Sequence, residues 1–325
     1  MLVLAVVLLL SGAAVGAMAL LGTSALQVRR GLSREELHQA LREEARKVLD
    51  QLGRPTSPEV DAAADPVWTY VASRRGEGRE IALEDLSSRL NLNMVRTELL
   101  EKTELAGLVT PGHSPQELRQ FRADHGPFSS LSAYAPFFSP GVLERYFTVF
   151  GYVNVNAAFE DSLRQLFAAR TGDGPSSEAF QNVLRGYLAR KEMVRGEELP
   201  SLLGLYYPQL YPLMNVEPQM NVNFVPEEVL HAVLSYPYGG KRIEGFEAAC
   251  QAILAERAQG GVDERRLAAM VPARADQLLV FQYLGSRTWF WKIRVAEAGH
   301  SVEWVLARLP GGPPVRFAIL QDRFQ

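Results

Sequence analysis

Cysteine is almost absent from this chain of 325 residues, which contains only Cys250. A single cysteine excludes a disulfide within the chain and any metal site built from several thiolates. The five histidines show no spacing typical of metal ligands; they are His38, His113, His125, His231 and His300. We therefore expect Cys250 to be a small buried hydrophobic residue on a helix, and the histidines to be surface or helix-face residues.

Sequence motifs for nucleotide binding and nucleophilic catalysis are also missing. The chain has no Gly-x-Ser-x-Gly elbow, no Walker loop and no Gly-x-Gly-x-x-Gly phrase. Its formal net charge is −3, and residues 88–272 contain 17 Lys and Arg against 21 Asp and Glu. A surface that binds nucleic acid would need an excess of positive charge. The sequence thus argues against an enzyme and against a nucleic-acid partner.

The N-terminal segment is a long apolar run. Residues 2–26 carry no charge and are rich in Leu, Val and Ala. About 20 such residues, folded as a helix, cross the hydrocarbon core of a bilayer. Gly12 and Gly16 lie one turn apart, a spacing that lets two helices approach closely in lipid. We predict a transmembrane helix with a face suited to helix packing.

An amphipathic pattern follows this run without a break. Apolar residues recur every three to five positions among charged ones: Leu32, Leu37, Leu41, Ala45, Val48 and Leu52. This period is typical of a helix with one buried face. We predict one continuous helix from near Leu2 to about Leu52, with a length of about 75 Å.

Strand-like segments lie on both sides of the middle of the chain. Residues 67–71 and 79–86 are rich in aromatic, β-branched or alternating residues and predict a hairpin. After Pro272, four further runs predict a meander: residues 278–283, 288–296, 302–309 and 315–320. We expect the two groups to form one antiparallel sheet, so that the helical residues between them are an insertion in an α+β domain.

The middle of the chain repeats one phrase three times: LNLNMVRTELL, VNVNAAFEDSL and MNVNFVPEEVL. The repeated asparagines are Asn91 and Asn93, Asn154 and Asn156, and Asn221 and Asn223, at separations of 63 and 67 residues. An acidic residue stands seven positions after each first Asn: Glu98, Asp161 and Glu228. Asparagine favours turns and helix starts, and an acid in a first helical turn complements the helix dipole. We interpret the phrases as an internal repeat of short helical units, and these residues as structural. Later in each copy an Arg precedes a polar turn: Arg122, Arg190 and Arg257.

These features together resemble the minor pseudopilin K family of bacterial type II secretion systems (general secretion pathway protein K). The best-matching phrases are residues 85–93, residues 126–131 and residues 220–230. The resemblance implies a transmembrane and amphipathic helix (1–53), a pilin-like β domain in two parts (54–87 and 273–325), and an all-α insertion (88–272). It also implies a non-catalytic subunit at the tip of a periplasmic pseudopilus.

The resemblance extends to location, partners and cofactors. It implies a single-pass protein of the bacterial inner membrane that binds other minor pseudopilins and the secretion platform of that membrane. Family members also bind calcium, but no motif in this chain matches those ligands residue by residue, so we assign none and expect no other cofactor.

The N-terminus departs from the family pattern in one respect and agrees with it in another. Met1 leads directly into apolar residues, whereas the family has a short basic leader that a peptidase removes. The chain is therefore expected either to start near the mature end or to keep its helix as an uncleaved anchor. Ala5 stands where most pilins have Glu, as is usual in this subunit class.

Two other functions stay open at this stage. The helical repeats resemble helix-hairpin-helix modules that bind DNA, although the Gly-apolar-Gly hairpin and the positive charge of such modules are missing. Alternatively, the protein is a signal-anchored envelope protein whose tyrosine-rich segments, residues 206–208 and 236–238, bind a peptide or a glycan.

Overall fold

The computed structural model describes residues 34–57, 59–74, 79–156, 160–172, 174–190, 192–210, 213–237, 242–271, 280–309 and 315–325. The predicted membrane span at residues 2–26, with Gly12 and Gly16, lies outside these residues. Within the described ranges, no helix combines the length and the apolar character needed to cross a bilayer.

A four-stranded antiparallel sheet carries the N-terminal helix. Its order is β1-β8-β9-β10, formed by β1 (Arg79–Asp85), β8 (Phe290–Glu297), β9 (His300–Arg308) and β10 (Phe317–Phe324). Ile81 of β1 pairs with Val295 of β8, more than 200 positions later in the chain. The residues between β1 and β8 are therefore an insertion, and the predicted α+β class with an antiparallel sheet is confirmed.

One face of this sheet is covered by the N-terminal helix, which is described over residues 34–52. Leu41, Ala45, Val48 and Leu52, spaced three or four apart, are at most 5% exposed and pack on the apolar side chains of β1, β8 and β9. The predicted amphipathic face is confirmed for this part of the helix. At the far end of the sheet, the Arg34 guanidinium lies over the Phe324 ring, 5.4 Å from its centroid.

The strand predicted at residues 67–71 is wrong, because this segment lies within helix α2 (Pro66–Arg74). Val67 and Val71, four positions apart, both point into the core beneath the sheet, and Pro66 starts the helix in the position where its missing N–H costs nothing. The predicted hairpin is therefore absent: β1 follows α2 and pairs with β8 instead. Residues 281–283 form a turn rather than the predicted strand.

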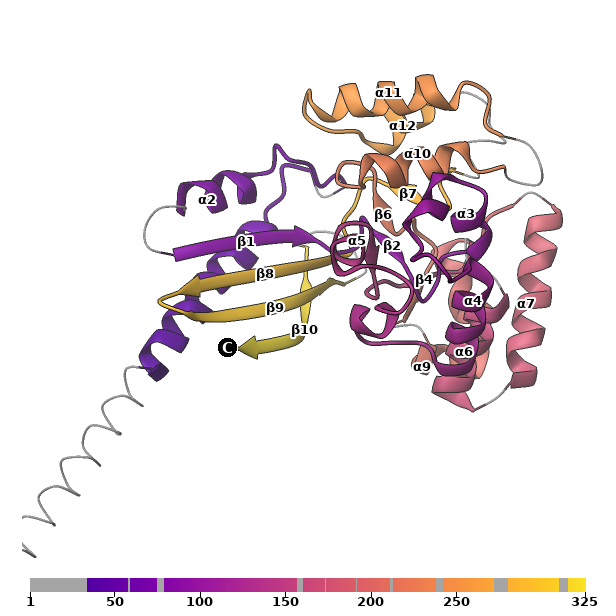
Figure 1. The fold of residues 1–325 in the computed structure, drawn as a ribbon, viewed down its shortest axis with the longest axis horizontal. Coiled ribbons are helices and arrows are strands. Elements are labelled where there is room, and N and C mark those ends of the chain that lie inside the picture. The colour runs from indigo at the N-terminus through magenta and orange to yellow at the C-terminus, as the bar shows by residue number, and fades with distance from the viewer. Residues whose placement is uncertain are drawn as a thin grey trace, which may run out of the picture.

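The insertion consists of short helices and three pairs of two-residue strands (Figure 1). Its α-helices are α3 (Thr97–Glu101), α4 (Pro115–His125), α5 (Pro140–Tyr146), α6 (Glu160–Thr171), α7 (Gly174–Ala189), α8 (Leu199–Leu203), α9 (Tyr207–Leu210), α10 (Glu227–Ser235), α11 (Phe246–Arg257) and α12 (Glu264–Met270). Four 3₁₀ helices join them: η1 (Glu104–Leu108), η2 (Leu131–Tyr134), η3 (Gly196–Glu198) and η4 (Gly204–Tyr206). Cys250 is buried on α11, as predicted.

The insertion has two hydrophobic cores. One core is shared by residues 90–147 and 220–284, which are far apart in sequence. The buried residues of the other all lie within residues 153–214, with Met94 and Val216 packed against them. The middle part of the insertion therefore packs largely around itself, while the first and last parts are fused.

A buried carboxylate joins the N-terminal helix to α2. Glu44 has a side chain that is 1% exposed, and it accepts hydrogen bonds from the Tyr70 hydroxyl at 2.7 Å, from Arg74 Nε at 3.1 Å and from Lys47 Nζ at 3.3 Å. Burial alone would raise the pKa of Glu44, but the hydrogen bonds of Tyr70 and Lys47 and the charge of Arg74 hold it below its ordinary value.

We predict that Glu44→Gln lowers the free energy of unfolding at pH 7 by about 1–3 kcal/mol. Because the folded state lowers the pKa of Glu44, this carboxylate stabilises the protein above about pH 4.5, and the contribution is lost as the pH falls through the lowered pKa. The difference between the two proteins should therefore shrink in acid. Urea unfolding followed by tryptophan fluorescence measures it, with exposed Glu43→Gln as the control; equal effects of both variants would contradict the assignment.

Candidate functional site

The three Asn-x-Asn phrases occupy equivalent places in three parallel strand pairs. These pairs are β2 (Leu90–Asn91) with β3 (Phe147–Thr148), β4 (Val153–Asn154) with β5 (Met214–Asn215), and β6 (Met220–Asn221) with β7 (Leu284–Gly285). In each pair the first Asn lies in the opening strand. The closing strands β3 and β5 come just before the next phrase. Each copy therefore ends beside the strand with which it began, and the next copy follows.

The side chain of the first asparagine in each phrase forms a local turn with the backbone that follows it. Its Oδ1 accepts a hydrogen bond from the backbone N–H of the second asparagine, at 2.9 Å in the first phrase, 3.0 Å in the second and 2.9 Å in the third. This Asx turn requires a short side chain with an acceptor two residues before the N–H. It accounts for the spacing of two between the asparagines.

The second asparagine of each phrase holds a distant part of the chain. Its Oδ1 accepts from, and its Nδ2 donates to, the backbone of one residue 35 to 39 positions later. The pairs are Asn93 with Phe128, Asn156 with Val194, and Asn223 with Val262. A carboxamide can make both bonds because it carries a donor and an acceptor on one carbon. The sequence did not identify these partners, although Phe128 lies in the phrase at residues 126–131.

The acidic residues of the phrases lie at helix starts. Glu98 is in the first turn of α3, Glu228 is in the first turn of α10, and Asp161 is the second residue of α6. Glu228 also accepts hydrogen bonds from Arg145 Nη2 at 2.6 Å and from the Tyr146 hydroxyl at 2.9 Å, both on α5. It thereby links the last part of the insertion to the first.

Two arginines, the buried Arg122 and the half-buried Arg257, form hydrogen bonds with the phrases. Arg122 Nη1 donates to the carbonyls of Leu92 at 2.9 Å and Val95 at 2.8 Å. Arg257 Nη1 donates to the equivalent carbonyl of Val225 at 2.9 Å, and burial lowers the pKa of Arg257 to about 10. Arg190 of the middle copy instead donates to a nearby carboxylate. Sequence inspection placed these arginines at helix ends but missed their contacts with the phrases.

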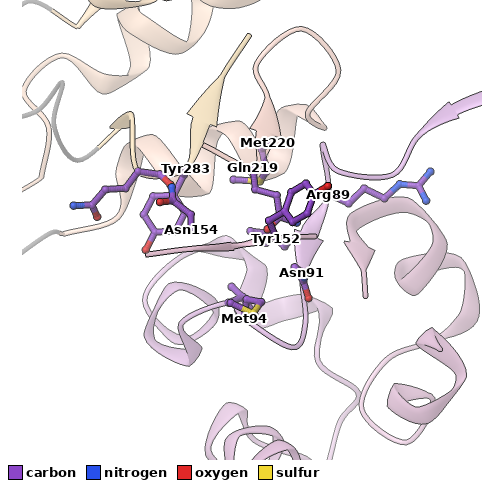
Figure 2. A pocket seen from close by; sticks show the side chains of 11 residues that line it. Arg89, Asn91, Met94, Tyr152, Asn154, Gln219, Met220 and Tyr283 are labelled. Carbon is purple, nitrogen blue, oxygen red and sulfur yellow. The ribbon is translucent and has the colours of Figure 1, made fainter. Parts of the chain in front are cut away.

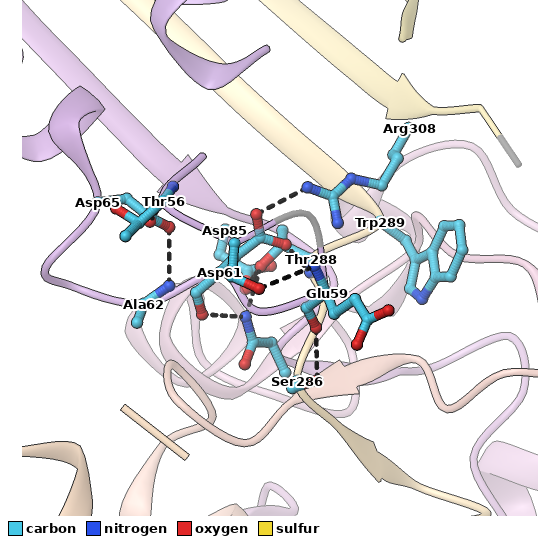
Figure 3. Close-up of polar contacts among 12 residues, drawn as sticks. Thr56, Glu59, Asp61, Ala62, Asp65, Asp85, Ser286, Thr288, Trp289 and Arg308 are labelled. Atoms are coloured by element: carbon cyan, nitrogen blue, oxygen red, sulfur yellow. Dashed lines mark hydrogen bonds and ion pairs between the residues drawn. The ribbon is translucent and has the colours of Figure 1, made fainter. Parts of the chain in front are cut away.

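A buried polar junction connects the third phrase to the sheet (Figure 3). The carbonyl of Asp61 accepts from Asn221 Nδ2 at 2.9 Å and from Asn223 Nδ2 at 3.1 Å. The carboxylate of Asp61 accepts from the Thr288 N–H and from Arg308 Nη2, both at 2.7 Å. One residue thus contacts the third phrase, the segment before β8 and the end of β9.

Close packing of the backbone accompanies this junction. Gly261 has a φ of +113°, a conformation that favours glycine, and a Cβ built there would lie 2.7 Å from the Cβ of Ala62. Phe224 of the third phrase packs against Trp68 and Trp291, with ring centroids 5.5 and 6.0 Å away, and the two tryptophan rings also contact each other. The third phrase therefore contacts the sheet through Phe224 as well as through the polar junction.

Asp85 ends β1 inside the same junction and is fully surrounded by donors. Its carboxylate accepts from the backbone N–H groups of Ser87 at 2.8 Å and Ser88 at 3.0 Å, and from the Thr288 hydroxyl at 2.6 Å. Burial nevertheless raises the pKa of Asp85 from 3.8 to about 6, and burial also raises the pKa of Asp61. Apart from the matching phrase at residues 85–93, no sequence pattern predicted these roles of Asp61 and Asp85.

The three phrases converge on one small pocket (Figure 2). It has a volume of about 50 Å³ and is lined by residues that include Asn91, Met94, Tyr152, Asn154 and Gln219. In the part of the chain that the structure describes, no group of three or more His, Cys, Asp or Glu side chains could hold a metal ion.

The similarity of this chain to known proteins lies among solved structures. No protein-family model and no curated protein matches the chain. Among solved structures, the chain is similar to a chain of the GspK–GspI–GspJ complex from the type 2 secretion system of enterotoxigenic Escherichia coli. The match covers 91% of this chain and 99% of that chain, with 14% sequence identity and a TM-score of 0.41.

We predict that the junction makes stability depend on pH through Asp85. Because the folded state raises its pKa, it binds the proton more tightly than the unfolded chain does, and the free energy of unfolding falls as the pH rises from about 4 to about 6. The shift corresponds to about 3 kcal/mol. Asp85→Asn removes this titration, so its stability relative to the unmodified protein should rise by about that amount between pH 3.5 and pH 7.

Urea unfolding at the two pH values measures this difference, and Asp50→Asn, at an exposed position, is the control. A difference between Asp85→Asn and the unmodified protein that stays constant with pH would show that Asp85 does not titrate in the folded state as described.

Proposed function

We propose that the protein is a minor pseudopilin of a type II secretion system, a non-catalytic subunit that assembles with other minor pseudopilins and the inner-membrane platform. The observation that carries this proposal is the placement of an amphipathic helix along an antiparallel sheet, with a helical insertion between β1 and β8. In the sequence, this helix follows an uncharged run of 25 residues.

The arrangement of these parts suits the tip of a filament. Figure 1 places the helical insertion at one end of the sheet, and Arg34 lies at the other end beside Phe324. The uncharged run, residues 2–26, precedes Arg34 in the sequence. With that run in the inner membrane and the bulk of the chain in the periplasm, the insertion adds volume above the sheet. Such volume would block a further subunit on top, which supports a capping or nucleating role.

We also infer that residues 90–148, 153–215 and 220–285 are three copies of one unit. Each copy opens with an Asx turn, holds a returning segment through its second asparagine and closes with a parallel strand.

The hydrogen bonds of these backbone N–H groups also bear on the alternative of DNA binding. The N–H groups of the second asparagines are bonded within the chain, so they are not available to phosphate.

The test is capture of partner subunits by the full chain in membranes. We expect the tagged chain, co-expressed with the other minor pseudopilins of the same bacterium, to be crosslinked to at least one of them. Gly12→Leu with Gly16→Leu should weaken the complex about tenfold by keeping partner helices apart. Ala13→Leu with Ala17→Leu, which has the same spacing on another side of the helix, is the control. If the unmodified chain captures none of these subunits, the proposal fails.

A further inference from the structure

The first asparagines of the three phrases differ in what their side-chain N–H groups bind. Asn154 Nδ2 donates to the carbonyl of Gln282 at 2.9 Å. Asn221 Nδ2 donates to the carbonyl of Asp61 at 2.9 Å and to the Thr288 hydroxyl at 3.0 Å. Asn91 is only 6% exposed and makes the same Asx turn, yet its Nδ2 has no hydrogen-bond partner among the described residues. Asn91 Nδ2 is not among the described side-chain atoms that are fully buried without a partner, so in the pocket it is left to solvent or to an acceptor from outside the chain.

This unpaired amide lines the pocket where the phrases converge (Figure 2). Its Nδ2 lies beside Gly151, where an added Cβ would be 2.7 Å away. The neighbouring polar side chains already have partners: Gln219 Nε2 donates to the Phe150 carbonyl at 3.1 Å, and Arg89 is paired with Glu84. The position in front of Asn91 Nδ2 is thus available to an acceptor from outside.

The size of the pocket restricts what can enter. Its volume is about 50 Å³, and it is open to solvent on one side. Sites for whole small molecules are usually about 300–1,000 Å³. This pocket therefore has room for a carbonyl group and a small side chain that project from a larger molecule. Its apolar lining comes from Leu90, Met94, Val95 and Met220.

The other two copies show which acceptor fits. In both, the amide is bonded to a main-chain carbonyl from a segment distant in sequence, 128 positions away for Gln282 and 160 for Asp61. We propose that the pocket at Asn91 receives a main-chain carbonyl from a polypeptide segment of another subunit, which completes the first copy as Asp61 completes the third. The inference rests on the proposed function for the identity of that subunit, a minor pseudopilin.

Substitution by aspartate tests whether Asn91 Nδ2 differs from the equivalent donors of Asn154 and Asn221. Asp keeps the acceptor of the Asx turn but replaces the N–H donor by an oxygen. In Asn154→Asp and Asn221→Asp this oxygen faces a carbonyl inside the protein, so the unfolding equilibrium constant should rise about tenfold or more. Asn91→Asp shares the cost of burying a carboxylate but faces no internal carbonyl, so it should raise the constant by a clearly smaller factor. If Asn91→Asp destabilises the chain as much as Asn154→Asp, its donor has an internal acceptor and the proposal is overturned.

The binding test uses the full chain co-expressed with the other minor pseudopilins of the same bacterium. We expect Asn91→Asp to weaken their binding about tenfold through repulsion of the incoming carbonyl. A photo-crosslinking amino acid at Arg89, on the rim of the pocket, should react with the bound subunit, while the same amino acid at exposed Gln120 on α4 should not.

The outcomes distinguish the two proposals. If the unmodified chain binds a pseudopilin and Asn91→Asp binds it equally well, solvent satisfies the donor, and the inference about the pocket is wrong while the proposed function stands. If the unmodified chain binds no pseudopilin, both are wrong.

Discussion

The position of the helical insertion relative to the sheet depends on one hydrogen-bond acceptor, the carbonyl of Asp61. It takes hydrogen bonds from both asparagines of the third phrase, while the carboxylate of the same residue holds Thr288 and Arg308 of the sheet region. The Asp61 N–H in turn donates to the Ser286 carbonyl at 2.9 Å. Because Asp61, Asn221, Thr288, Ser286 and Arg308 are buried, separating the insertion from the sheet would leave several polar atoms without partners at once. The helical insertion and the helix-bearing sheet are therefore held in one relative position.

Asparagine fixes the position of a returning segment better than a hydrophobic residue would. Each phrase presents one acceptor to its own backbone and a donor–acceptor pair to a returning segment, so the side chain fixes both a turn and a distant contact. Hydrophobic side chains supply the stability of the cores but would allow neighbouring segments to slide. The polar contacts select one register for each returning segment.

Local patterns in the sequence predicted the parts of the fold that depend on local rules. The helix through Leu41 to Leu52, the strands of the sheet and the Asn-x-Asn turns follow from periodicity and from side-chain geometry. Residues 67–71 were predicted wrongly, because valine, tryptophan and tyrosine suit a strand as well as a buried helix face. Asp61 was not predicted, since its partner Arg308 lies 247 positions away and no local pattern links them.

The claim that the third phrase joins the insertion to the sheet is tested most directly by comparing it with the second phrase, whose copy has its own core. Asn223→Asp places an oxygen against the carbonyls of Asp61 and Val262, whereas Asn156→Asp places one against those of Val194 and Val216. Hydrogen exchange of the full chain, followed by mass spectrometry, should show faster exchange in both α10–α12 and β8–β9 for Asn223→Asp. For Asn156→Asp, faster exchange should be confined to α6–α9. If Asn223→Asp leaves the exchange of β8 and β9 unchanged, the third phrase does not join the insertion to the sheet.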